Sequence, residues 1–157
     1  MPRTPTEVVR AVTAEVSRLI SGGLTDREQA AAFDELAGLY AEDTDVRHPF
    51  APLGDTPLRT RAEVRAHFVG APDRTPAVDR FEVVDQVVHR TDDPEVVIQE
   101  FSYAITRDGR DFTLPCVFIT RVRDGLIVES RDYAHHLAGA RAFGRLDELL
   151  DNLATEG

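Results

Sequence analysis

Apolar residues in the first half of the chain recur every three or four positions, which is the spacing of an amphipathic helix. The clearest set is Val8, Val12, Val16 and Leu19, and a Gly-Gly pair follows it. Two further segments open with a Thr followed three positions later by a Glu, the signature of a capping box at a helix N-terminus. The pattern predicts helices over residues 6–21, 25–43, 60–71 and 137–154, with an extended piece at 44–50.

Apolar and polar residues alternate in the second half of the chain, and turn residues separate the runs. Asp-Gly pairs at 108–109 and 124–125 are strong hairpin signals. The element order is helix, helix, strand, helix and then a meander of four strands. This order predicts an α+β domain with helices on one face of a curved antiparallel sheet. The four strands are expected over residues 80–90, 96–107, 112–123 and 126–133.

Composition limits the possible functions. The 157 residues suffice for one domain with a buried core. The formal net charge of −10 argues against nucleic acid and anionic membranes as partners, because both require a basic surface. No apolar run approaches the ~20 residues of a membrane span, and residues 1–10 lack a signal core, so we expect a cytoplasmic protein. The absence of Lys excludes a lysine Schiff base, and the single Cys116 excludes a disulfide framework.

Two stretches of the sequence resemble a known superfamily. ELAGLYAEDTDVRHPFAPLGDTPLRTRAEVRAHF, residues 35–68, looks like the opening of nuclear transport factor 2-like proteins, and VFITRVRDGLIVESRDYAHH, residues 117–136, resembles their final hairpin. With the element order, the resemblance covers residues 25–136. It implies a cone-shaped α+β barrel, in which a curved antiparallel sheet surrounds a deep apolar cavity and the helices pack on its concave face. Residues 1–157 then form a single SnoaL-like domain with a C-terminal helical extension over 137–155.

Alternation along each strand decides which side chains face that cavity. The resemblance places Asp132 on the cavity side. On the strand over 96–107 we assign Glu100 and Ser102 to the same side. On the strand over 112–123 we choose the even-numbered residues, on the assumption that the hairpin loop holds three residues. These are Phe112, Leu114, Cys116 and Phe118.

The opposite face of the expected sheet is also apolar. A lone domain would leave such a patch in water, and patches of this kind usually mark an interface. Members of the superfamily are commonly dimers through this face, so the resemblance implies a homodimer. The patch is expected to contain Val97, Phe101, Tyr103, Ile105, Val117 and Ile119.

Asp132 carries the candidate chemistry. In the ketosteroid isomerases the catalytic base precedes a proline, where this chain has His48, and their second acid falls at or next to Phe118. Limonene epoxide hydrolases use an Asp, an Arg and an Asp; Asp132 matches one Asp, while Glu100 and Ser102 stand at about the other two positions. SnoaL-like cyclases use one Asp of the last strand as the acid/base of an intramolecular aldol closure. The resemblance implies this last role for Asp132.

The physical chemistry of a buried acid agrees with this role. A carboxyl group in an apolar pocket has a raised pKa, so Asp132 can transfer protons near pH 7. His48 is expected to hydrogen-bond to Asp132 or to shuttle its proton. Glu100, if buried beside Asp132, would drive the two pKa values apart and leave one acid and one base. The structural alternatives are a salt bridge from Asp132 to an arginine and an ion pair at Glu100.

The substrate and the reaction class complete the hypothesis. We expect a cofactor-free acid/base enzyme of small-molecule, secondary metabolism without a metal site: a SnoaL-like cyclase or isomerase, or an epoxide hydrolase-like enzyme. Its substrate is expected to be a hydrophobic carbonyl or epoxide compound. The alternative is a non-catalytic small-ligand-binding or dimerisation module that uses the same cavity. The expected substrate contacts are Tyr40, Phe50, Phe68, Ser102, Phe112, Leu114, Cys116 and Phe118, with His136 at the cavity mouth.

Overall fold

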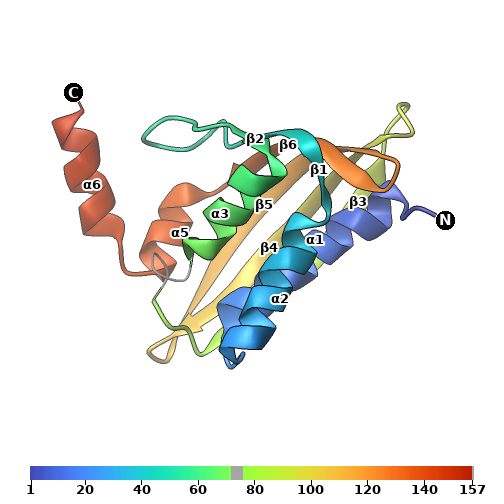
Figure 1. Cartoon of the computed structure of the whole chain (residues 1–157). Coiled ribbons are helices and arrows are strands. Elements are labelled where there is room, and N and C mark those ends of the chain that lie inside the picture. Colours follow the sequence, from blue (N-terminus) through green and yellow to red (C-terminus); the bar gives the residue numbers. More distant parts are fainter. Residues whose placement is uncertain (72–75, 157) are drawn as a thin grey trace.

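The computed structural model describes residues 1–71 and 76–156. Its helices and strands follow the expected order except for a short additional strand, β2, before α3 and a second C-terminal helix, and they confirm the α+β class (Figure 1). The elements are α1 (Pro5–Ser21), α2 (Asp26–Ala37), β1 (Tyr40–Arg47), β2 (Leu58–Thr60), α3 (Arg61–Val69), β3 (Arg80–Arg90), β4 (Val96–Arg107), β5 (Arg110–Arg123), β6 (Leu126–Ala134), α5 (His136–Ala142) and α6 (Leu146–Thr155).

Capping boxes start the three N-terminal helices. In α1 the Thr4 hydroxyl accepts a hydrogen bond from the Glu7 N–H, and the Glu7 carboxylate accepts one of 2.7 Å from the Thr4 N–H. The boxes expected at Thr25 and Thr60 form in the same way, because each Thr is followed by a Glu three positions later. The helix at Thr25 is shorter than expected, since the chain enters β1 at Tyr40.

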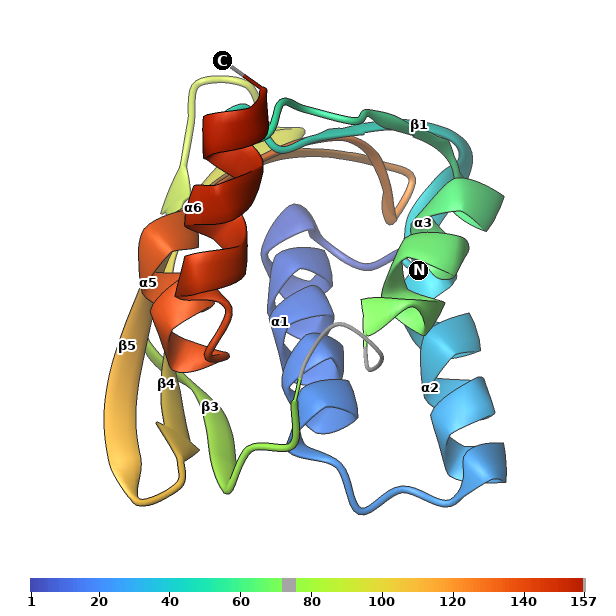
Figure 2. The ribbon, with the colours of Figure 1, turned by 90° about the vertical axis from the view of Figure 1, so that its left-hand side faces the viewer.

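The strands of the described residues form one curved sheet in the order β2-β1-β6-β5-β4-β3. Neighbouring strands are antiparallel except β1 and β6, which are parallel. The sheet does not close, so the expected barrel is an open cone with β2 and β3 at its edges. α1 packs on β3, β4 and β5, α3 packs on β1 and β2, and α2 packs beside α1 and α3 (Figure 2).

The turn between β4 and β5 decides which way the β4 side chains face. Arg107 pairs with Arg110, so the loop holds only Asp108 and Gly109. Both residues have positive φ, 52° and 72°, as a two-residue type I′ turn requires. Such a loop places even-numbered residues of β5 opposite odd-numbered residues of β4. The expected three-residue loop is therefore wrong. Because even-numbered residues of β5 face the interior, the odd-numbered residues of β4 that pair with them face the interior as well.

The interior face of β4 thus consists of residues that we expected on the outside. Val97, Phe101, Tyr103 and Ile105 are each at most 6% exposed. The last three pack in a core cluster with Cys116, a small buried residue. The predicted composition of the apolar outer patch, from which we expected a homodimer, is therefore wrong. Of that set only Val117 and Ile119 lie on the outer face, where they alternate with the interior residues of β5.

A bulge in β6 changes the alternation expected for that strand. The pairing of β6 with β5 skips Val128, which is an extra residue in β6. Ile127 before the bulge is buried, and Ser130 and Asp132 beyond it are buried as well. The strict alternation that we expected from Leu126 onward is wrong at this point, although Asp132 still faces the interior.

The C-terminal segment contains two helices where we expected one. Gly144, with φ of 68°, lies between α5 and α6. α5 packs on β5, whereas α6 buries none of its residues and projects from the body (Figure 1). None of the helices in the described ranges has the length and apolarity needed to cross a bilayer.

Candidate active site

Asp132 lies on the interior face of β6, opposite Phe118 of β5. It is 9% exposed, and its Oδ1 accepts a hydrogen bond of 2.6 Å from the Ser130 hydroxyl. Burial raises the pKa of the Asp132 carboxyl to about 6, while the Ser130 hydroxyl and the nearby His48 act in the opposite direction. Ser130 Oγ lies 3.1 Å from Thr120 Oγ1. The buried Ser130 hydroxyl, which also contacts the Thr120 hydroxyl, therefore holds one carboxylate oxygen of Asp132 and leaves Oδ2 for other contacts.

The parallel pairing of β1 with β6 brings His48 next to Asp132. Arg47 of β1 pairs with Arg131 of β6, so the residues that follow them are also neighbours. His48 Nε2 lies 3.9 Å from Asp132 Oδ2, which is within ion-pair reach but too long for a direct hydrogen bond. The backbone N–H of His48 donates to Asp55 Oδ1 at 2.9 Å. This bond fixes the chain where it leaves β1 and holds the imidazole at the chamber.

His67 of α3 stacks on His48, with ring centroids 5.6 Å apart and ring planes at 28°. We did not predict His67 as a site residue. The helical spacing could have identified it, because Val64, His67 and Phe68 share one helix face. Val64 is 1% exposed, so that face points into the interior.

An apolar chamber of about 180 Å³, here called the Asp132 chamber, lies between the helices and the sheet. Residues from α1, α3 and all strands except β3 line it. Five of the expected substrate contacts are among them: Tyr40, Phe68, Leu114, Cys116 and Phe118. The remaining lining residues are Val12, Val16, Val46, His48, Leu58, Val64, His67, Tyr103, Asp132 and Ala134.

The Cys116 thiol and the Tyr40 phenol in the wall of the Asp132 chamber stay protonated near neutral pH. Burial raises the pKa of the Cys116 thiol to about 12, so the thiol is not a nucleophile at pH 7. Burial also raises the pKa of the Tyr40 phenol above its ordinary value, and the charge of Asp132 adds to this effect. Tyr40 therefore keeps its hydroxyl hydrogen and can donate a hydrogen bond inside the chamber.

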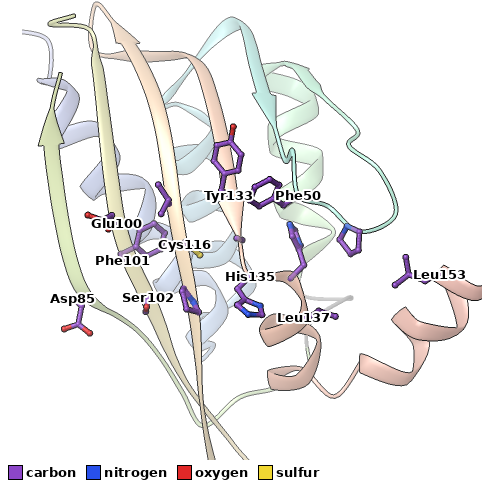
Figure 3. Close-up of a pocket in the computed structure, with 15 residues that line it drawn as sticks. Phe50, Asp85, Glu100, Phe101, Ser102, Cys116, Tyr133, His135, Leu137 and Leu153 are labelled. Carbon is purple, nitrogen blue, oxygen red and sulfur yellow. The ribbon is translucent and has the colours of Figure 1, made fainter. Parts of the chain in front are cut away.

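Glu100, Ser102 and Phe50 lie elsewhere, along an outer groove of about 800 Å³ (Figure 3). Glu100 and Ser102 are even-numbered residues of β4 and face outward, and Glu100 Oε2 lies 2.5 Å from His89 Nε2. Phe50 is 66% exposed, and its ring packs edge-on against Tyr133 with centroids 4.8 Å apart. The expectation that these three residues share a cavity with Asp132 is wrong, because the two-residue turn reverses β4 and the loop after β1 carries Phe50 outward.

The outer groove is larger than the Asp132 chamber, but its acids are surface groups. The Glu100 side chain is 57% exposed and is paired with His89, and Asp85 is exposed as well. Water solvates such carboxylates, and their pairs contribute little. Asp132 is instead a buried acid in an apolar chamber, with a raised pKa. That combination marks a functional site, so we take the Asp132 chamber as the candidate active site.

Phe112 and His136 are expected contacts that lie outside the Asp132 chamber. Phe112 is partly buried against the core, and the Arg110 guanidinium lies 5.6 Å from its ring centroid. His136 begins α5 and lines both a neighbouring space of about 470 Å³ and the outer groove. Its Nε2 is buried and has no hydrogen-bond partner within the described ranges. Burial lowers the pKa of His136, and the charges of His48 and His135 lower it further.

The chemistry available in the Asp132 chamber is proton transfer. The chamber offers a carboxyl group that titrates close to neutral pH, a phenol that stays protonated and an imidazole at 3.9 Å from the carboxylate. Across residues 1–71 and 76–156, no three His, Cys, Asp or Glu side chains are grouped so as to hold a metal ion. The apolar wall selects a hydrophobic molecule, and Asp132 can take a proton from it or give one to it.

Comparison with known proteins places the chain in a family. The model of the SnoaL-like domain matches residues 23–130, and the chain belongs to this family. No curated protein matches the chain. The family match stops just before Asp132, so the role of Asp132 depends on the geometry of the site.

Solved structures share the fold over nearly the whole chain. A protein from Bacillus subtilis, provisionally named an isomerase, aligns with a TM-score of 0.69 and 22% identity over 89% of this chain and 92% of that one. A protein from Pseudomonas putida KT2440, provisionally named a polyketide cyclase, aligns with a TM-score of 0.63 and 19% identity over 90% and 98%. A Catenulispora acidiphila protein with a ketosteroid isomerase-like fold, solved with trimethylamine, aligns with a TM-score of 0.62 and 19% identity over 90% and 95%. At these identities the likeness establishes the fold alone.

Proposed function

We propose that the protein is a cofactor-free acid/base enzyme of small-molecule, secondary metabolism, a cyclase or isomerase that acts on a hydrophobic carbonyl compound. One observation carries this proposal: Asp132 is a buried carboxyl with a pKa of about 6 in an apolar chamber. Its contacts are the Ser130 hydroxyl and the His48 imidazole. Among the described residues no arginine forms an ion pair with it, which argues against a purely structural salt bridge.

The reaction begins with proton abstraction. Near pH 7 most of the Asp132 carboxyl is ionised and acts as a base. It takes a proton from the carbon next to the substrate carbonyl, and the electrons of the C–H bond move to the carbonyl oxygen to form an enolate. The Tyr40 hydroxyl donates a hydrogen bond to that oxygen, and the His48 imidazole lies 3.9 Å from the Asp132 carboxylate. The step is redox-neutral and needs no electron carrier.

The enolate then has two outcomes. In an isomerase the protonated Asp132 returns the proton to a different carbon. In a cyclase the enolate carbon attacks a second carbonyl carbon of the same molecule, a C–C bond forms, and Asp132 gives its proton to the new alkoxide. An epoxide substrate would use the protonated form of Asp132. Asp132 donates its proton to the epoxide oxygen as a water molecule attacks the ring carbon and the C–O bond breaks, and the attacking water then returns a proton to Asp132. The raised pKa serves each route, because both protonation states are accessible near neutral pH.

Isotope exchange tests this proposal without knowledge of the natural product. The enzyme is incubated in D₂O with 4-propylcyclohexanone, a ketone whose ring suits the chamber, and loss of the α-protons is followed by NMR. Wild-type protein should accelerate exchange, and Asp132→Asn should remove the acceleration while circular dichroism shows an unchanged fold. The matched control is Asp151→Asn on the exposed face of α6. Exchange that persists in Asp132→Asn would contradict the assignment and favour a non-catalytic ligand-binding module.

Two further expectations stand as proposals. The homodimer now rests on the outer groove, where Phe50, Val117 and Leu137 are 66%, 37% and 47% exposed. Apolar side chains gathered in one groove favour contact with a second copy. The cytoplasmic location expected from composition stays a prediction.

A further inference from the structure

A second space adjoins the Asp132 chamber. This vestibule measures about 470 Å³ and shares the residues His67, Leu114 and Ala134 with the chamber. Its walls come from the loop after β1, from α5 and from α6. Beyond the shared residues, its polar side chains are His136, Arg145, Glu148 and Asn152. The vestibule is therefore more polar than the chamber that it adjoins.

His136 lines both the vestibule and the outer groove, and one of its polar atoms lacks a partner among the described residues. His136 Nε2 is buried, yet no described residue forms a hydrogen bond with it. The adjacent His135 uses its Nδ1 to accept a hydrogen bond of 3.1 Å from the Ala138 N–H, so capping of α5 does not involve His136. A buried polar atom without a partner is costly and usually marks a place where a water molecule or a ligand belongs. A neutral imidazole nitrogen can accept a hydrogen bond or donate one, according to its tautomer.

The size of the Asp132 chamber limits the part of the substrate that reaches the acid. An apolar cavity of about 150 Å³ accepts a molecule of benzene, whereas drug-sized ligands fill pockets of about 300–1,000 Å³. The chamber of about 180 Å³ therefore holds one six-membered ring and little more. A molecule with four fused rings exceeds it.

We propose that the substrate is a compact ketone with a single ring, which fills the chamber against Asp132, and with a second oxygen outside the ring, which binds His136 Nε2 in the vestibule. This inference rests on the proposed acid/base function and specifies its substrate class. The two spaces together have the volume of a pocket for a small organic molecule, and each contributes one polar contact. The specificity for the second oxygen comes from His136, because an analogue without that oxygen leaves Nε2 unpaired.

Calorimetric titration with three ketones tests the inference. 4-(2-Hydroxyethyl)cyclohexanone and 4-propylcyclohexanone have nearly the same shape and differ only in that a terminal hydroxyl replaces a terminal methyl group. Wild-type protein should bind the hydroxylated ketone roughly tenfold more tightly than the propyl ketone, which corresponds to one good hydrogen bond. A four-ring steroid ketone should bind at least roughly tenfold more weakly than either. A steroid ketone that binds as tightly as the single-ring compounds would overturn the size argument.

Two substitutions at His136 separate a binding role from a structural one. His136→Phe keeps a ring but removes the nitrogen, and it should abolish the advantage of the hydroxylated ketone. His136→Gln retains a hydrogen-bonding group and should preserve part of that advantage, and it also serves if the Phe variant does not fold. His89→Phe, an exposed histidine of the outer face, is the control and should change nothing. An undiminished advantage in both His136 variants would overturn the inference.

The exchange assay separates this inference from the proposed function. Exchange that depends on Asp132, together with equal binding of the two cyclohexanones, would overturn the role of His136 and leave the acid/base function standing. The expected binding pattern without any α-proton exchange would support the proposed ligand class and contradict the acid/base function.

Discussion

At the scale of single residues, Asp132 owes its properties to a few neighbours. The apolar wall raises the pKa of its carboxyl, while the hydrogen bond from Ser130 to Oδ1 and the nearby His48 lower it. The balance sets the pKa at about 6, close to the range in which a group exchanges protons most effectively. Asp132 is therefore tuned by one hydroxyl that can be removed without changing the acid.

Removal of that hydroxyl should raise the pKa. In Ser130→Ala the Asp132 carboxylate loses its donor, and its charged form becomes less favourable. We expect the Asp132 pKa to rise above that of the wild type, which ¹³C NMR titration of the carboxyl group would measure. Ser102→Ala on the outer face of β4 is the matched control. An unchanged or lowered pKa in Ser130→Ala would show that Oδ1 does not depend on this bond.

Asp132 should also reduce the stability of the fold at neutral pH. Its pKa is about 6 in the folded protein against 3.8 in its ordinary state, so between these values the folded state binds more protons than the unfolded state. The free energy of unfolding then falls as pH rises from about 4 to about 6 and stays low above that range. Asp132→Asn removes this penalty, which is at most about 3 kcal/mol.

Urea unfolding of both proteins measures this effect. The difference in unfolding free energy should move in favour of Asp132→Asn as pH rises from about 4 to about 6.5 and then remain constant. A difference that does not depend on pH would mean that the Asp132 pKa is not raised in the folded state.

At the scale of elements, the pairing of strands brings the site together. His48 reaches Asp132 because β1 runs parallel to β6, and these strands are more than 80 positions apart in sequence. The direction of the Asp132 side chain depends on the bulge at Val128, which shifts the alternation of β6 by one residue. Neither feature has a local sequence pattern, since both depend on the register with a distant strand.

Some elements could be predicted from sequence because their causes are local. Thr25 and Thr60 start helices since each has a Glu three positions later, and these bonds form within one turn. The turn at Asp108-Gly109 has an equally local signal for two residues. Our assumption of a longer loop put Glu100 on the same face as the even-numbered residues of β5, whereas the two-residue turn puts them on opposite faces. We placed Asp132 on the interior face from the family resemblance. The structure has it on the same face, because the bulge at Val128 precedes it. His67 is a residue that helix spacing alone would have identified.

α6 gives a prediction at the same scale. It buries none of its residues, but Leu149 and Asn152 contribute to the wall of the vestibule. A chain that ends at Gly144 should lose no more than about 1 kcal/mol of unfolding free energy in urea titration. Its affinity for 4-(2-hydroxyethyl)cyclohexanone should fall severalfold in calorimetry, because the vestibule opens to water. A large loss of stability would instead assign α6 to the core, and unchanged affinity would exclude it from the vestibule.

At the scale of the whole molecule, one sheet has two different faces. The inner face and the helices enclose the Asp132 chamber, whereas the outer face carries the outer groove beside the ends of α5 and α6 (Figure 3). Towards β3 and the β5–β6 turn the outer side is charged, and Arg121 pairs there with Asp93 and Glu95. An apolar groove next to satisfied ion pairs is suited to contact with a second copy.

A charge in the outer groove should separate the proposed dimer. Val117 lies at the centre of β5 on this face and is 37% exposed. Val117→Asp should give a protein of half the wild-type mass in size-exclusion chromatography with light scattering, because a buried unpaired charge opposes association. Ala30→Asp on the exposed surface of α2 is the control and should leave the mass unchanged. A wild-type protein that is monomeric at all concentrations would exclude this interface.

The pH dependence of α-proton exchange tests the central claim most directly. The base must be ionised, so the rate of 4-propylcyclohexanone exchange by the wild-type protein should rise with pH through a midpoint near the Asp132 pKa of about 6 and then level off. Asp132→Asn should show only the background rate, without that step. If the step is present in Asp132→Asn, or if the wild-type profile has no inflection near pH 6, Asp132 is not the catalytic base of this protein.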